Sequence, residues 1–157
     1  MSKATGVPAI ALESPIQPDV LALFKASDAY HQALYPAESN YLLDPTTLTA
    51  DNVRFIVARL AGEAVGCGAV MLQPDGSAEI KRMWVDANAR GTGLGRRLLQ
   101  ELETLARAER SLIIQLETGI SQPEAQSLYK SAGFDECPPF GQYEVDPLSV
   151  FMAKQID

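Results

Sequence analysis

The sequence is poor in cysteine and histidine and has no long apolar run. Its 157 residues include two cysteines and one histidine. Cys67 and Cys137 have neither the close spacing of metal ligands nor the number that a disulfide framework needs, so we expect no metal site. No apolar run approaches the ~20 residues that cross a membrane, and the first residues, MSKATGVPAIALESP, lack the apolar core of a secretion signal. We therefore expect a cytoplasmic protein with no membrane partner.

Basic residues are also scarce. Thirteen Lys and Arg stand against 20 Asp and Glu, which gives a formal net charge of −7. This balance argues against a nucleic-acid partner, because the phosphate backbone is bound by a basic face. The apolar fraction of 46% and the charged fraction of 21% are ordinary for a globular protein. The length fits a single domain that spans residues 1–157.

Apolar periodicity predicts the order of the structural elements. A helix at 121–133 is framed by a capping-box pair, Ser121 and Glu124, and by Gly133 as the residue that ends it. The turn PDGS at 74–77 predicts a hairpin. Strands are expected at 9–14, 53–60, 65–73, 78–85, 112–116, 134–137 and 149–156, and the other helices at 18–34 and from 93 to about 109. This order predicts an α/β (α+β) fold with a mixed sheet and helices on its faces.

A glycine-rich loop, RGTGLG at 90–95, joins an expected strand to an expected helix. Such a junction presents free backbone N–H groups and the positive end of the helix dipole, which together bind phosphate oxygens. The P-loop pattern fails, because Arg96 and Arg97 follow Gly95 where Lys and Ser or Thr are required. The dinucleotide fingerprint fails as well, because Arg96 occupies the place of its third glycine.

Two segments resemble the GNAT superfamily of N-acetyltransferases. The segment IKRMWVDANARGTGLGRRLLQELE at 80–103 is similar to the strand, loop and helix that hold the pyrophosphate of acetyl-CoA, and Arg90, Gly93 and Gly95 fit its Arg-x-x-Gly-x-Gly pattern. The segment AQSLYKSAGF at 125–134 is similar to a second signature, in which a tyrosine stands four residues before a Gly-Phe pair. The C-terminal part also resembles a small bacterial branch that is sometimes labelled indole-3-acetic acid acetyltransferase.

The resemblance implies a fold, a cosubstrate and a place for it. The GNAT-like fold is a largely antiparallel sheet with a central parallel pair and helices on both faces, and the cosubstrate is acetyl-CoA without a metal. Backbone groups of the strand end pair with the pantetheine arm, N–H groups of the loop bind the pyrophosphate, and Arg90 fixes the loop or contacts phosphate. Gln122 stands where the family often has an asparagine. The implied cofactor-binding residues are Met83, Trp84, Val85, Arg90, Gly91, Thr92, Gly93, Leu94, Gly95, Arg96 and Gln122.

A general base is expected among two carboxylates. An amine arrives mostly as ammonium, so a carboxylate with a raised pKa, acting directly or through water, must take a proton before the nitrogen can attack. Glu79 stands where some family members carry such a base. Glu117 is the alternative, because it lies at the C-terminal end of an expected parallel strand. Alternation with a period of two places Glu79, Lys81, Met83 and Val85 on one face and Ile80, Arg82 and Trp84 on the other.

Tyr129 is the candidate general acid. The departing CoA thiol has an ordinary pKa of ~8.5 and a phenol one of ~10, so a tyrosine hydroxyl can protonate the leaving sulfur. A place for Tyr129 on the buried face of its helix is compatible with that role. The single histidine, His31, lies on an expected helix and is interpreted as a structural residue rather than a catalyst.

The resemblance implies transfer of an acetyl group to a primary amine of a small molecule by direct attack in a ternary complex. Two alternatives stay open: a non-catalytic acyl-CoA sensor, and a lysine or N-terminal protein acetyltransferase. A homodimer also stays open, as do the acceptor's identity and the choice of base. The residues that could line the acceptor pocket are Tyr30, Tyr35, Tyr41, Phe140 and Tyr143.

Overall fold

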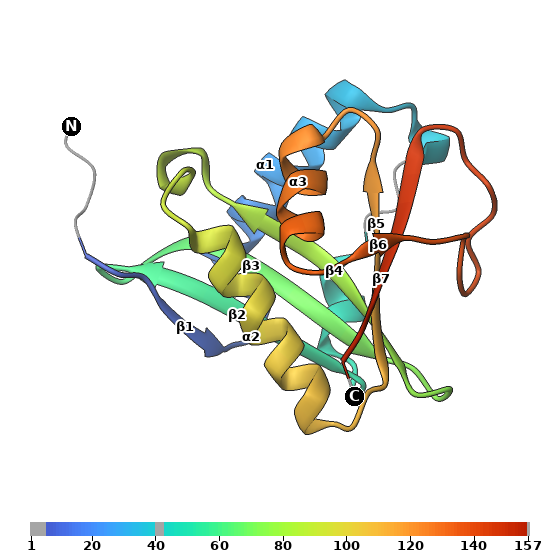
Figure 1. Ribbon diagram of the computed structural model, residues 1–157. Coiled ribbons are helices and arrows are strands. Elements are labelled where there is room, and N and C mark those ends of the chain that lie inside the picture. Colours follow the sequence, from blue (N-terminus) through green and yellow to red (C-terminus); the bar gives the residue numbers. More distant parts are fainter. Residues whose placement is uncertain (1–5, 40–42, 157) are drawn as a thin grey trace.

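The computed structural model describes residues 6–39 and 43–156, and its centre is a seven-stranded sheet (Figure 1). The strands are β1 (Ala9–Leu12), β2 (Val53–Leu60), β3 (Glu63–Leu72), β4 (Ser77–Val85), β5 (Ile113–Gly119), β6 (Asp135–Glu136) and β7 (Ser149–Gln155). Their order in the sheet is β1-β2-β3-β4-β5-β7-β6. All neighbouring pairs are antiparallel except β4 and β5, which are parallel. The predicted mixed sheet with a central parallel pair is confirmed.

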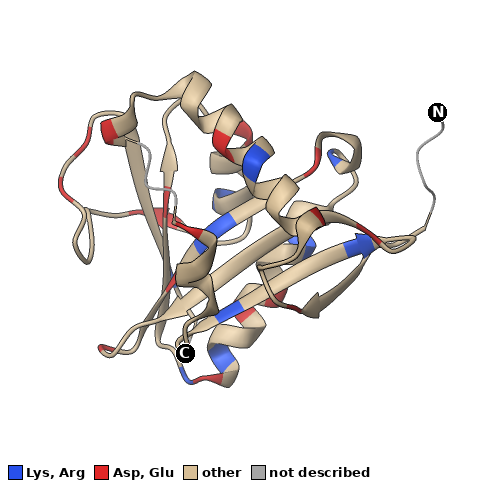
Figure 2. Cartoon of the chain, turned by 180° about the vertical axis from the view of Figure 1, so that it is seen from behind, with Lys and Arg blue, Asp and Glu red and all other residues tan. Residues whose placement is uncertain are grey.

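Three α-helices cover the two faces of the sheet. They are α1 (Pro18–Leu34), α2 (Leu94–Ala108) and α3 (Pro123–Ser131), and short 3-10 turns lie at η1 (Ala37–Ser39), η2 (Pro45–Thr49) and η3 (Ala87–Ala89). The buried side of α2 is a stripe of leucines that packs with Ile56, Val70 and Ile114 of the strands, and Tyr129 of α3 belongs to the same core. On the opposite face, seen in Figure 2, α1 packs a second core of Val20, Leu23 and Phe24 onto β2 and β3.

A bulge in β4 changes which side chains face which helix. The register passes from Ala69↔Lys81 to Cys67↔Trp84, so β4 contains one more residue than β3 between these two pairs. Arg82, inside the bulge, has a φ of 56°. Strict alternation is therefore wrong beyond Lys81. Met83 and Val85 pack with Ile80 against the α2 core, whereas Glu79, Lys81, Arg82 and Trp84 are on the α1 side. The alternation pattern missed the bulge, since an extra residue in one strand shows only against its partner strand.

The parallel pair β4–β5 is short. Three residue pairs join the strands, from Ser77↔Ile113 to Glu79↔Gln115. Beyond this point the two strands diverge, and the remaining β4 residues, Ile80–Val85, have no β5 partner. Figure 1 shows β4 and β5 separating toward the end where the glycine loop and α3 begin. The sheet is therefore forked at its centre, and backbone groups of β4 are left for another partner.

The beginning and end of α3 differ in how well the sequence predicted them. The Ser121–Glu124 capping box is wrong: α3 is capped by Gln122 without a side-chain cap bond and starts at Pro123. Proline is favourable at this first helical position, because an N–H there would have no acceptor within the helix and its absence costs nothing. The end is confirmed, because Gly133 has a φ of 98° and the N–H of Phe134 donates to the carbonyl of Tyr129 at 3.0 Å.

Within residues 6–39 and 43–156, no helix combines the length and apolarity needed to span a bilayer. The same residues contain no group of three or more His, Cys, Asp or Glu side chains arranged to hold a metal ion.

Candidate active site

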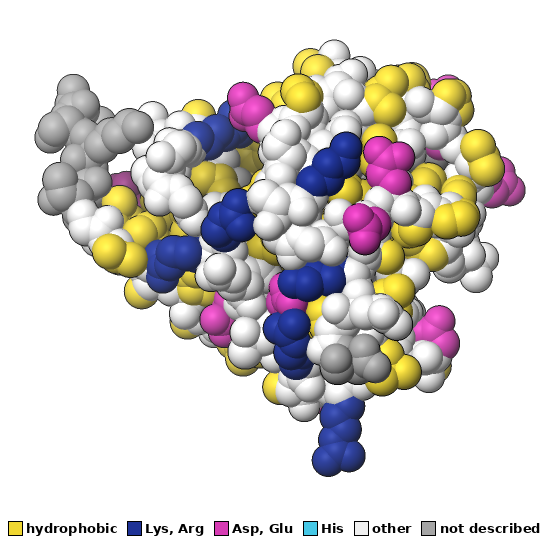
Figure 3. Space-filling view, viewed as in Figure 1, with side chains coloured by type: hydrophobic (Ala, Val, Ile, Leu, Met, Phe, Trp, Pro, Cys, Tyr) yellow, Lys and Arg dark blue, Asp and Glu magenta, His cyan; other side chains and the backbone are white. Residues whose placement is uncertain are grey.

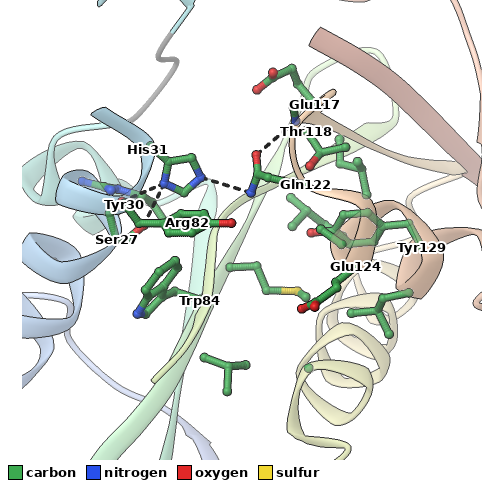
Figure 4. Close-up of a pocket in the computed structure, with 18 of the residues that line it drawn as sticks. Ser27, Tyr30, His31, Arg82, Trp84, Glu117, Thr118, Gln122, Glu124 and Tyr129 are labelled. Atoms are coloured by element: carbon green, nitrogen blue, oxygen red, sulfur yellow. Dashed lines mark hydrogen bonds between the residues drawn. The ribbon is translucent and has the colours of Figure 1, made fainter. Parts of the chain in front are cut away.

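A cavity of about 550 Å³ opens in the fork between β4 and β5 (Figure 4). One wall comes from the C-terminal half of α1, the floor from the outer part of β4, and the other wall from the end of β5 and from α3. The glycine loop and the start of α2 close one end. The cavity therefore brings together most of the residues that the sequence singled out, although they come from four separate segments of the chain.

The glycine loop leaves space and free donors at this end. Gly91 and Gly93 have φ values of 76° and 82°, a left-handed conformation that side chains resist, and a Cβ built on either would touch nothing within 4 Å. The helix α2 starts at Leu94 after Gly93, so its first N–H groups have no helical acceptor. Gly95 is different, because a Cβ built on it would lie 3.3 Å from the Leu128 side chain of α3. At this position glycine allows α2 and α3 to pack closely.

Arginines surround this loop, but their side chains already have partners. The Arg90 guanidinium lies 4.7 Å above the Trp84 ring and donates to the carbonyl of Val85 at 3.2 Å, so it holds the loop against the end of β4. Arg96 donates to the Ser131 hydroxyl of α3. Figure 3 shows Lys and Arg side chains on the surface around the start of α2, although the protein is acidic overall. Thr92 donates to the Ala89 carbonyl at 2.6 Å and stabilises the turn.

The floor of the cavity is the bulged part of β4. Met83, Trp84 and Val85 line it, next to the unpaired edge of the strand. Trp84 packs against both Tyr30 and Arg90, with the Tyr30 ring centroid at 5.4 Å. The buried Trp84 Nε1 has no hydrogen-bond partner among the described residues.

Glu117 lines the cavity from the end of β5, near Thr118 (Figure 4). Its Oε2 accepts the Ser149 hydroxyl at 2.9 Å. Burial is the largest cause that raises the pKa of this carboxyl, and the negative charges of Asp146 and Glu79 raise it further. The Ser149 hydrogen bond and the positive charge of Lys81 act in the opposite direction. Glu117 is thus a partly desolvated carboxylate at the place where open α/β sheets bind ligands.

Glu79 is placed differently. It is buried on β4, where it pairs with the Lys81 ammonium at 3.0 Å and accepts the Tyr143 hydroxyl at 2.7 Å. Lys81 also donates to the Tyr143 hydroxyl. Lys81 lines the cavity, whereas Glu79 lies behind it. The Glu79 carboxylate is therefore occupied by partners that hold the loop at 137–148 onto the sheet.

Tyr129 lies on the buried face of α3 and lines the cavity. Its ring packs edge-on against Phe134, with the centroids 5.9 Å apart. The hydroxyl forms no hydrogen bond with any residue in the part of the chain that the structure describes. Burial raises the pKa of Tyr129 to about 12, and the negative charge of Glu117 contributes to the rise. Glu117 and Tyr129 therefore influence each other across the cavity.

Gln122 connects α3 to α1 rather than standing free. Its Oε1 accepts the Gly119 N–H at 3.2 Å and the Tyr35 hydroxyl at 3.1 Å, and its Nε2 lies 3.4 Å from His31 Nε2. The Tyr35 hydroxyl in turn accepts the Ser121 N–H at 3.2 Å. These bonds join the end of α1 to the turn between β5 and α3.

Two loops meet beside the cavity at Ser39, which lines it. Ser39 of η1 donates to the Asp146 carboxylate of the loop at 137–148, with 2.7 Å between the oxygens. Of the expected pocket residues, Tyr30 and Tyr35 line the cavity. Phe140 and Tyr143 instead pack with Phe151, at 5.8 and 5.3 Å between ring centroids, and support the loop from outside. Tyr41 lies outside the described residues.

Sequence reasoning missed several residues that face the cavity. His31, interpreted as structural, lies in its wall, and Arg82, Thr118 and Glu124 also line it. Thr118 could have been found, since it follows Glu117 at the end of a parallel strand. His31 had no such signal, because its partner Gln122 is 91 positions away in the chain.

Comparison with known proteins gives one family. The model of the Acetyltransferase (GNAT) family matches residues 20–134. The chain is 48% identical over 148 residues to a protein of Azospirillum brasilense named IAA acetyltransferase, with 94% of this chain and 97% of the relative covered. It is 35% identical over 123 residues to YsnE, an uncharacterized N-acetyltransferase of Bacillus subtilis, with 77% and 82% covered.

Solved structures agree with the sequence relatives. A protein of Klebsiella pneumoniae, provisionally described as an acyl-CoA N-acyltransferase, superposes with a TM-score of 0.82 at 37% identity and covers 96% of this chain and 98% of its own. The ribosomal-protein-S18-alanine N-acetyltransferase of Escherichia coli superposes with a TM-score of 0.66 at 20% identity, over 95% and 94% of the two chains. The second likeness concerns the fold alone.

Proposed function

Because the chain belongs to the GNAT family of acetyltransferases, and so transfers acetyl groups from acetyl-CoA, we propose that its acceptor is a primary amine of a small molecule. The observation that carries this proposal is the Ser39–Asp146 bond, which joins two loops beside the cavity. A protein acetyltransferase needs an open groove for an extended chain. Here the loops at 36–39 and 137–148 meet instead, and Glu79, Lys81 and Tyr143 hold the second loop down.

The residues around the fork fit acetyl-CoA. The N–H groups from Gly91 to Arg96 would hold its pyrophosphate, and Gly91 and Gly93 leave the backbone accessible. The unpaired β4 edge at Met83, Trp84 and Val85 would bind the pantetheine arm as an added strand, with one N–H directed at the thioester oxygen. Arg90 would act through the loop that it holds. We assign no direct contact to Gln122, since both ends of its amide already have partners.

The acceptor nitrogen would attack the thioester directly. A covalent acyl-cysteine route is disfavoured by the surroundings of the two thiols. Cys67 is fully buried in the α1 core, where desolvation raises its pKa to about 12. Cys137 is partly exposed, and burial raises the pKa of its thiol as well. A nucleophilic cysteine needs the opposite shift, toward the thiolate.

Glu117 is the proposed general base, in preference to Glu79. It faces the cavity, whereas Glu79 is held behind the cavity by Lys81 and Tyr143. The raised pKa of Glu117 brings a carboxylate closer to the pKa of the ammonium from which it must take a proton. The Ser149 hydroxyl fixes one carboxylate oxygen and leaves the other for the substrate.

Tyr129 is the proposed general acid, and its acidity depends on the state of Glu117. With a pKa of about 12, the hydroxyl is protonated at every working pH and is available to donate to the leaving sulfur. Ionised Glu117 is one cause of that high value. Once Glu117 has taken the amine proton it is neutral, so the pKa of Tyr129 falls at the step that needs its proton. The base thus makes the acid stronger in the order that the reaction requires.

An acceptor screen with detection of released free thiol tests the proposal. The panel contains small primary amines, amino acids, aromatic amines, aromatic carboxylic acids and short peptides with a free N-terminus or lysine. We expect turnover with one or more small amines and not with peptides. Preference for peptides would transfer the function to protein acetylation, and acetyl-CoA binding without any turnover would favour a sensor. A product formed from an aromatic carboxylic acid without an amine would overturn N-acetylation.

A further inference from the structure

His31, the single histidine in the sequence, belongs to a hydrogen-bonded network from Ser27 to Gly119. At each end of this network the donor and the acceptor can be assigned. At one end its Nδ1 lies 2.7 Å from the carbonyl oxygen of Ser27, one turn earlier on α1. A carbonyl oxygen only accepts hydrogen bonds, so Nδ1 must carry the hydrogen. The Ser27 hydroxyl lies farther away, at 3.4 Å, and adapts to either role.

The other end is fixed by Gly119. Its backbone N–H donates to the Gln122 side chain at 3.2 Å, so the atom it meets must be the amide oxygen. The amide nitrogen of Gln122 therefore faces His31 Nε2, at 3.4 Å. Because that nitrogen only donates, Nε2 must accept. A histidine that donates at Nδ1 and accepts at Nε2 is neutral, and Figure 4 shows these bonds running across the top of the cavity.

We propose that His31 and Gln122 are positioning residues for acetyl transfer, and that the neutral imidazole, acting through the Gln122 amide, holds the end of β5 against the start of α3. The end of β5 carries Glu117, two residues before Gly119, and α3 carries Tyr129. The hydrogen bonds therefore set how the proposed base and acid face each other. The catalytic part of this inference rests on the proposed function, whereas the protonation state of His31 does not.

Protonation of His31 cannot be accommodated in this arrangement. An imidazolium would direct an Nε2–H against the N–H group of Gln122. Turning the amide over would satisfy the imidazolium, but it would place the amide N–H group against the N–H of Gly119. The Tyr35 hydroxyl would also lose its bond to the Gln122 oxygen. Either way, a neutral His31 is required for the complete set of bonds, so we expect activity to fall when His31 is protonated.

The charged groups around His31 differ in how they could obscure this effect. Arg82 is held by Asp28, and Arg90 lies over the Trp84 ring. Protonation of Glu117, the proposed base, would lower kcat/KM at acidic pH independently of His31. The titratable and charged groups that line the same cavity from the neighbouring elements are Tyr30, Tyr35, Lys81, Arg82, Arg90, Glu117, Glu124 and Tyr129. Replacing His31 removes its titration and leaves these groups in place.

Nuclear magnetic resonance tests the protonation state directly. With one histidine in the sequence, ¹H–¹⁵N correlations of the imidazole in ¹⁵N-labelled, tag-free protein need no assignment. We expect hydrogen on Nδ1 and none on Nε2 at neutral pH. Hydrogen on Nε2 at neutral pH, in either the other tautomer or the imidazolium, would overturn the inference. Because this measurement needs no substrate, it is decisive even if the acceptor screen fails.

Two variants of His31 test its role in catalysis. In His31→Gln the side-chain oxygen can accept from Gln122 as Nε2 does, but it does not titrate. We expect this variant to keep most of the parent's kcat/KM at high pH. On the acidic side of the pH profile, it should lack the fall in kcat/KM that protonation of His31 causes in the parent. His31→Lys presents a permanent donor, and we expect about tenfold lower kcat/KM at every pH, equivalent to one or two lost hydrogen bonds. Identical pH profiles of the parent and His31→Gln would overturn the positioning role.

Gln122→Glu reverses the direction of the bond with His31 and leaves the bonds from Gly119 and Tyr35 unchanged. A carboxylate accepts from Gly119 and Tyr35 with one oxygen and from a protonated His31 with the other. We expect the imidazolium to persist to higher pH in this variant than in the parent. If His31 titrates at the same or a lower pH, the two side chains are not coupled and the inference fails.

Discussion

Gly119 lies directly beneath the hydroxyl of Tyr35, and we predict that Gly119→Ala destabilises the protein through this one contact. The Tyr35 hydroxyl oxygen occupies the space that a Cβ on Gly119 would take. The backbone is not the obstacle, because Gly119 does not have a positive φ. At such a position the change from glycine to alanine would otherwise stabilise the fold by about 0.4–1 kcal/mol. The sign of the effect therefore depends on Tyr35 alone.

The size of the effect follows from what Tyr35 must give up. To make room, its hydroxyl must leave the Gln122 oxygen and the Ser121 N–H. Two hydrogen bonds at about 0.5–1.5 kcal/mol each contribute about 1–3 kcal/mol. Partial exposure of the ring, now buried, offsets the gain from removing a glycine. We expect a net loss of about 1–3 kcal/mol, which for a chain of this size lowers Tm by about 2–12 °C.

A double-mutant cycle measures the contact by itself. Urea unfolding and Tm are recorded for the parent, Gly119→Ala, Tyr35→Ala and the double variant. With the tyrosine side chain removed, Gly119→Ala should be neutral or stabilising by up to about 1 kcal/mol. The two changes would thus be strongly non-additive. If Gly119→Ala costs the same stability in both backgrounds, the overlap with Tyr35 is not the cause and the reasoning is refuted.

Four further predictions concern the proposed chemistry. Glu117→Gln should lower kcat/KM by about 10²–10⁴-fold at neutral pH, and the loss should shrink as pH rises and free amine accumulates, whereas Glu79→Gln should show no such pH-selective loss. Because burial raises the pKa of Glu117, the folded protein holds the Glu117 proton more tightly than the unfolded chain does, so folding stability falls as pH rises from the ordinary pKa to the raised one. Glu117→Gln should therefore raise Tm at neutral pH but not at acidic pH. Tyr129→Phe should keep acetyl-CoA affinity and Tm near the parent values while kcat falls by about 10²–10⁴-fold, and an unchanged kcat would remove Tyr129 as the acid. Gly93→Val should abolish the rise in Tm that acetyl-CoA produces. Gly62→Val is the matched control, because Gly62 also has a positive φ, 84°, and nothing within 4 Å of its added Cβ, but it does not line the cavity.

Features that depend on neighbouring residues were predictable from the sequence. The glycine loop, the amphipathic α2 and the end of α3 at Gly133 each follow from a pattern within a few residues. The order of the elements along the chain was also predicted, and the resemblance to a known family implied the mixed sheet with its central parallel pair. The resemblance to a known family assigned the glycine loop and Tyr129 to one ligand, and both line the same cavity, but the fork that forms this cavity was not predicted.

Features that depend on distant partners were not predictable. The bulge at Arg82 is defined by its register with β3 and inverts the faces of the residues that follow. Glu79 and Glu117 are equivalent in sequence terms, and only the position of Tyr143, in a loop more than 60 residues from Glu79, shows that Glu79 is engaged elsewhere. His31 and Gln122 likewise meet only when α1 and α3 are packed on the same sheet.

The short contact between β4 and β5 also bears on how the chain folds. The helix α2 packs on β2, β3 and β4, so the segment up to residue 108 can form a sheet with both of its faces covered. The segment from β5 onward joins it mainly through side chains, which are those of the shared α2 core, the Lys154–Glu103 ion pair, the Ser39–Asp146 bond and the bonds around Gln122. The parallel ladder between the two parts has three residue pairs. Because so short a backbone ladder joins the two parts, we expect hydrogen exchange to be faster in β5–β7 than in β2–β4. A molecule seated in the fork contacts both parts, and its binding would make them unfold as one unit.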